Sequence, residues 1–109
     1  MSALNIEKLI HDDLDYLLTK KSEQGELTLH KVIEVAAYVA AKYLRIIYTK
    51  NKEIKPEELN GVFGIISNFY SEIFNNELQD NEYQKISSTA LDLLQDTHFD
   101  NNCKEYFAS

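Results

Sequence analysis

Apolar residues recur at helical spacing in four segments of the chain. In the first, Ile6, Ile10, Leu14 and Leu17 fall on one stripe, because residues three or four positions apart share a face of an α-helix. Equivalent stripes predict helices over residues 6–21, 29–49, 56–75 and 80–96. This pattern leaves almost no room for β-strand, so the expected fold class is all-α.

Residues that favour helix starts stand near the expected boundaries. The first helix is expected to begin near Asn5, and Thr28 is a suitable N-cap for the second. Pro56 suits the first position of the third helix, where its missing N–H is no loss. Asp80 is the expected N-cap of the fourth.

The segments between these helices are short, which favours antiparallel neighbours. We therefore expect one domain, residues 1–109, folded as an antiparallel four-helix bundle. The tail places Phe99, Cys103, Tyr106 and Phe107 at helical spacing. It is consistent with either a short docked helical turn or a frayed end.

The second predicted helix has an unusually wide apolar surface. Its polar residues lie within an arc of roughly 80° at 100° per residue, and they are Lys31, Glu34, Tyr38, Lys42 and Arg45. The apolar remainder is more than twice the arc of about 100° that one core-facing stripe needs. One interpretation is a central helix on which the three other helices pack. The other, which does not exclude the first, is that a second copy of the chain covers part of this surface. The charges argue against a membrane span.

The third predicted helix has an outer face without charge. This face consists of Asn60, Gly61, Gly64, Ser67, Asn68 and Ser71, where a solvated helix normally carries Lys and Glu. Each interior glycine costs about 1 kcal/mol relative to Ala, which indicates a compensating close approach. Either another part of the chain packs there, or the face binds a partner or a second copy. We predict that it is an interface.

The formal net charge is −7, which argues against a nucleic-acid partner because phosphate contacts need surplus Lys and Arg. Residues 42–55 do interleave cations with Tyr43 and Tyr48, but they lie at a helix end that attracts cations anyway. The excess of acid lies in residues 56–109. There, Glu82, Asp92 and Asp96 share an arc of roughly 80°, and we predict that this face binds a basic protein partner.

No complete set of catalytic or metal-binding residues is visible. Glu7, His11 and Asp15 follow one another at intervals of four, but they are expected to form a solvated acidic face. Cys103 and His98 are five positions apart and lack an acidic residue to orient them. We therefore expect no enzyme activity, cofactor or metal.

A single cysteine and an N-terminus without an export signal indicate the cytoplasm, and the residue usage suggests an A+T-rich bacterial or phage gene. The sequence is typical of a small non-enzymatic protein-interaction module of the inhibitor, immunity-like, adaptor or chaperone type. The alternative is a structural or regulatory homodimer. A small enzyme and a nucleic-acid binder are less favoured.

Overall fold

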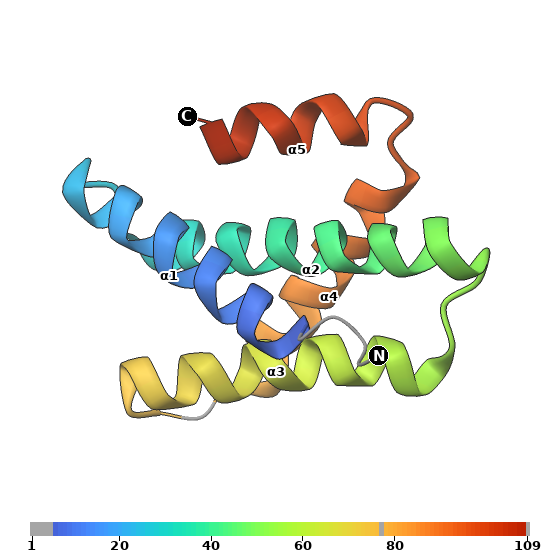
Figure 1. Cartoon of the computed structure of the whole chain (residues 1–109). Coiled ribbons are helices and arrows are strands. Elements are labelled where there is room, and N and C mark those ends of the chain that lie inside the picture. The colour runs from blue at the N-terminus through green and yellow to red at the C-terminus, as the bar shows by residue number, and fades with distance from the viewer. Residues whose placement is uncertain (1–5, 77, 109) are drawn as a thin grey trace.

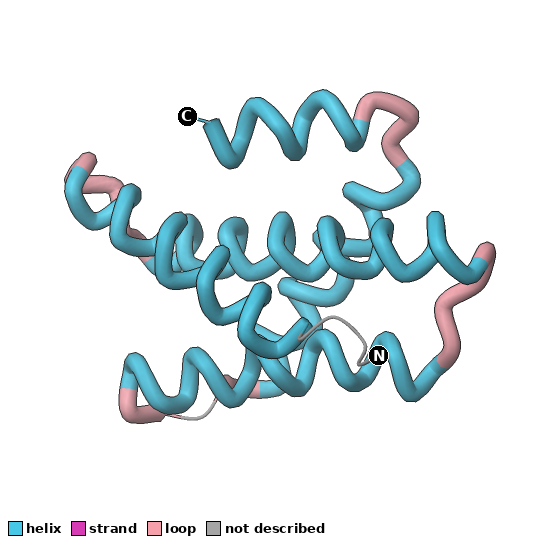
Figure 2. The backbone as a smooth tube through the Cα atoms, in the orientation of Figure 1, coloured by secondary structure: helices cyan, strands magenta, loops and turns pink. Residues whose placement is uncertain are grey.

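The computed structural model describes residues 6–76 and 78–108, which form five helices joined by short loops. The helices are α1 (Ile6–Glu23), α2 (Leu29–Asn51), α3 (Pro56–Phe74), α4 (Asp80–Gln95) and α5 (Phe99–Ala108). No strand occurs within the described ranges (Figure 2). The all-α class is confirmed, and the four predicted helices agree with α1 to α4 within two residues at each end. The start predicted near Asn5 lies outside the described residues.

The expected antiparallel four-helix bundle is not confirmed, because the tail forms a fifth helix. Phe99, Tyr106 and Phe107 share one side of α5, and Phe99 is buried in the common core. In Figure 1, α5 runs along one side of α2 while α3 lies on the opposite side and α4 passes behind. The tail is therefore a docked element of the fold.

Two of the three predicted helix starts that lie in the described residues are confirmed. The Thr28 hydroxyl accepts a hydrogen bond from the Lys31 N–H at 3.2 Å, and Pro56 begins α3. The prediction for Asp80 is wrong, because Gln79 is the N-cap of α4. Its N–H donates to the Glu82 carboxylate at 2.9 Å, so the acid three residues later satisfies this helix start.

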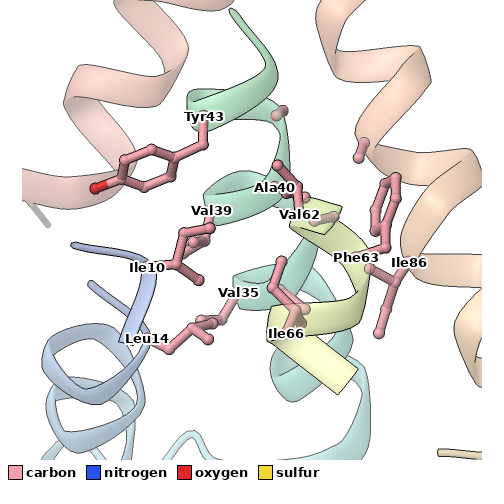
Figure 3. Close-up of a cluster of buried hydrophobic side chains, with 14 of the residues drawn as sticks. Ile10, Leu14, Val35, Val39, Ala40, Tyr43, Val62, Phe63, Ile66 and Ile86 are labelled. Atoms are coloured by element: carbon pink, nitrogen blue, oxygen red, sulfur yellow. The ribbon is translucent and has the colours of Figure 1, made fainter. Parts of the chain in front are cut away.

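Helix α2 is the centre of the fold, and α1, α3 and α4 pack on its wide apolar surface. Figure 3 shows Ile10 and Leu14 of α1 beside Val35 and Val39 of α2. The four alanines of α2 are wholly buried (Ala36, Ala37, Ala40 and Ala41). The interpretation that the other helices cover this surface is confirmed. None of the helices in the described ranges is both long and apolar enough to cross a membrane.

Candidate protein-binding surface

The charge-free face of α3 remains on the outside of the fold. Asn60, Gly61 and Asn68 are exposed, and the other three members of this face are partly exposed. A methyl group built at Gly61 or Gly64 would meet no neighbouring atom within 4 Å beyond the local helix backbone. The interpretation that these glycines admit another part of the chain is therefore wrong for the described residues. The face is open to an external partner.

An apolar groove of about 500 Å³ lies where the start of α2, the end of α3 and the start of α4 meet. Leu27, Leu29 and Phe74 line it while remaining 40%, 63% and 42% exposed. The remaining lining residues are Thr28, Val32, Tyr70, Asn76, Leu78, Gln79 and Glu82. Three large apolar side chains thus meet water in one concave place.

The groove has a rigid base. The hydroxyl of Tyr70, which is only 1% exposed, donates to the carbonyl oxygen of Val32 at 2.6 Å and so joins α3 to the first turn of α2. Burial raises the pKa of Tyr70, which keeps this donor protonated. The Phe74 ring meets the Tyr70 ring edge to face, with centroids 5.6 Å apart. Phe74 is therefore held at the wall of the groove.

The sequence pattern did not predict this groove. Leu27 and Leu29 flank a helix start, and Phe74 ends a helix with an ordinary apolar stripe. Only the tertiary fold brings these positions together, since 47 residues separate Leu27 from Phe74 along the chain. A run of apolar residues around the cap Thr28 was the only local signal.

The predicted acidic face of α4 is spread along the helix. Glu82 lines the groove and caps the start of α4, whereas Asp96 lies at the other end. At 1.5 Å per residue, these two positions are about 21 Å apart along the helix axis. The Asp96 carboxylate accepts a hydrogen bond from the His98 N–H at 2.8 Å and holds the turn into α5. Asp92 is exposed, so only Glu82 of the three belongs to the groove.

Helix α5 covers the polar strip of α2. The Tyr106 ring stacks on Tyr38 with centroids 3.9 Å apart, and its hydroxyl donates to the Glu34 carboxylate at 3.1 Å. Burial and then the Glu34 charge raise the pKa of Tyr106. Farther along, Arg45 Nε lies 3.6 Å from Asp100 Oδ1. The sequence placed the strip correctly and allowed for a docked tail, but it did not indicate that the tail would pack on this strip.

Asp13 of α1 contacts the same polar strip of α2. Its Oδ2 accepts hydrogen bonds from the Tyr43 hydroxyl at 2.6 Å and from Lys42 Nζ at 2.8 Å. Burial, followed by the bond to Asp13, raises the pKa of Tyr43. Lys42 Nζ also lies 4.5 Å from the centroid of the Phe107 ring. Lys42, Tyr43 and Arg45 are thus engaged within the protein, which weakens the interpretation of residues 42–55 as a nucleic-acid site only in part. Tyr48, Lys50 and Lys52 remain exposed.

Glu7, His11 and Asp15 do not form the predicted solvated face, because His11 points inward. Its ring packs against Phe69 with centroids 5.1 Å apart, and its Nε2 is buried without a hydrogen-bond partner among the described residues. Glu7 and Asp15 are exposed. Among the described residues, no three side chains of the metal-binding types are gathered into a group.

Cys103 lies partly buried in the seam between α2 and α5, whereas His98 is exposed before the start of α5. Burial raises the pKa of the Cys103 thiol, although the nearby Lys42 charge opposes this effect. A raised pKa lowers the thiolate fraction and therefore disfavours a nucleophilic role.

Comparison of the chain with protein-family models, curated proteins and solved structures finds no match.

Proposed function

We propose that this protein is a small, non-enzymatic interaction module that binds an amphipathic segment of another protein in the groove between α2, α3 and α4. The observation that carries the proposal is the joint exposure of Leu27, Leu29 and Phe74 in one concave place. Exposed apolar side chains that gather in a groove are typical of protein-binding sites, whereas scattered ones are not. The roles that fit are inhibitor, immunity-like protein, adaptor or chaperone.

The charge of the groove favours a basic partner. Among the residues that the structure describes, Glu82 is the only charged side chain that lines it, and α3 ends beside it without a basic residue in its last turn. The carbonyl oxygens at a helix C-terminus attract cations. The net charge of −7 would also speed the approach of a basic partner at low salt. We expect an apolar anchor residue in the groove, flanked by Lys or Arg.

The charge-free face of α3 extends this surface. Ser71 and Phe74 are three residues apart and therefore neighbours on the helix. A partner anchored at Phe74 could continue along Ser71, Ser67 and Gly64 without removing water from a charge. Glycine at position 64 allows a close approach of the partner backbone. Most of the wide apolar face of α2 is buried within one chain, so this face gives little support to a homodimer.

The test is a selection of helical peptides from a randomised display library against the wild-type protein. We expect the selected peptides to combine large apolar residues with Lys or Arg, and to bind less tightly as salt is raised. Leu29→Lys should weaken their binding about tenfold or more, because it removes an apolar side chain from the groove and repels the Lys or Arg of the peptides. Leu91→Lys is the matched control, since Leu91 is an exposed leucine (42%) on α4 that does not line the groove.

Selected peptides that bind Leu29→Lys as tightly as wild type would refute the groove as the binding site. Light scattering at high protein concentration separates the homodimer alternative from the proposal. A dimer that Gly64→Glu converts to monomer would favour self-association through α3. A monomer would leave the α3 face to a different protein.

A further inference from the structure

A second cavity, of about 350 Å³, lies in the seam between α2 and α5. Its apolar lining comes from Ile46 of α2 and from Phe99 and Phe107 of α5. Phe99 is 3% exposed and Phe107 is partly buried, whereas Ile46 is 39% exposed. The cavity therefore combines a buried aromatic wall with an opening to solvent. It is separate from the groove, with which it shares no lining residue.

The charges around this cavity are opposite to those of the whole chain. Lys42, Arg45 and Lys104 line it together with one carboxylate, Asp100. Lys42 is already paired with Asp13 at 2.8 Å. The Arg45–Asp100 pair is long at 3.6 Å, and both side chains are well exposed, so it contributes little stability. The Arg45 guanidinium can therefore exchange Asp100 for a better ligand.

We infer that this cavity binds a small amphipathic carboxylate of the medium-chain fatty acid class. The carboxylate would lie against Arg45 and Lys104, and its alkyl chain against Ile46 and Phe107. The planar guanidinium matches a carboxylate with two parallel hydrogen bonds. The volume is at the lower end of the range for small-molecule pockets, which fits such a ligand better than a protein segment.

Cys103 supplies a reporter for this site. It lines the same cavity and is partly buried there. A bound alkyl chain would shield the sulfur atom from a small alkylating reagent. The rate of Cys103 alkylation should therefore fall as the site fills. This readout requires no knowledge of the natural ligand.

The experiment is an NMR titration of the full chain with octanoate, with acetate and octylammonium as comparison ligands. We expect saturable shifts with octanoate at residues of α2 and α5, and much weaker binding of the other two. Arg45→Gln and Lys104→Gln should each weaken octanoate binding about tenfold, as expected for the loss of a charged hydrogen bond. Lys50→Gln removes the same charge from the last turn of α2 outside the cavity and should leave affinity unchanged.

Arg45→Gln also removes the contact with Asp100 of α5 and could weaken the packing of that helix. Lys104 is exposed, so Lys104→Gln tests the site without disturbing the fold. Octanoate should slow Cys103 alkylation in wild type and do so less in both cavity variants. Non-saturating shifts, equal binding of octylammonium, or an equal loss in Lys50→Gln would overturn the inference. Shifts confined to Leu29 and Phe74 would assign the fatty acid to the groove and overturn it as well.

Discussion

The ring of Tyr106 lies flat on the ring of Tyr38, with an interplanar angle of 6° and centroids 3.9 Å apart. This stack joins the last helix to the only polar strip of the central helix. The Lys21 Nζ lies 5.1 Å from the centroid of the Tyr106 ring, so α1 also reaches the same side chain. Tyr106 is therefore the point at which α1, α2 and α5 meet.

Replacing Tyr106 should release α5. We expect Tyr106→Ala to lower the free energy of unfolding by about 2 kcal/mol, because it removes both the stack and the burial of the ring. Tyr106→Phe keeps the ring and should lower the free energy of unfolding by about 1 kcal/mol, because it removes the hydrogen bond to Glu34. Urea unfolding measures both changes, and hydrogen exchange of the α5 amides should accelerate in Tyr106→Ala. Tyr48→Ala, at an exposed tyrosine of α2, is the control.

The stability of the protein should fall at alkaline pH. Burial raises the pKa of Tyr70, so the folded state keeps its phenol proton while the unfolded chain loses it above about pH 10. The stabilisation is present below that pH and is lost as pH rises. Tyr70→Phe should make the fall of the unfolding free energy with pH less steep, by up to about 1.4 kcal/mol per pH unit. Urea unfolding at a series of alkaline pH values measures the slope, and an unchanged slope would contradict the assignment to Tyr70.

The sequence predicted local features well and tertiary features poorly. The helices and the cap at Thr28 were predictable because spacing and capping act within a few residues. A docked tail was one of two alternatives, but its place on α2 was not predictable, because Tyr38 and Tyr106 are 68 residues apart. The charge-free face of α3 was visible in the pattern, but whether Gly64 faces a neighbour or solvent depends on the whole fold.

His11 illustrates the same limit at a single residue. Its spacing from Glu7 and Asp15 suggested a solvated face, yet its buried Nε2 has no hydrogen-bond partner in the part of the chain that the structure describes. We expect His11→Leu to raise the free energy of unfolding by about 1 kcal/mol, because it removes an unsatisfied polar atom. His30→Leu is the control at a side chain that is 83% exposed, and it should change stability by less than about 0.5 kcal/mol. Destabilisation by His11→Leu in thermal and urea unfolding would show that the ring contact with Phe69 outweighs the unsatisfied nitrogen.

Gly64→Ala separates a binding role of the α3 face from a structural one. A methyl group at this position meets nothing within 4 Å, and alanine is the better helix former. We expect the free energy of unfolding to rise by about 1 kcal/mol, measured by urea unfolding. A loss of stability would mean that position 64 is packed within the fold.

The same variant should bind its partner more weakly if the partner backbone approaches Gly64 closely, because the added methyl group keeps the two surfaces apart. Affinity for the selected peptides, compared between Gly64→Ala and wild type by calorimetry, measures this effect. Gly61→Ala adds a second methyl one helical turn away and should act in the same direction. A variant that is more stable yet binds less tightly would show that the glycine is retained for recognition. Equal affinity would confine the binding site to the groove around Leu29 and Phe74.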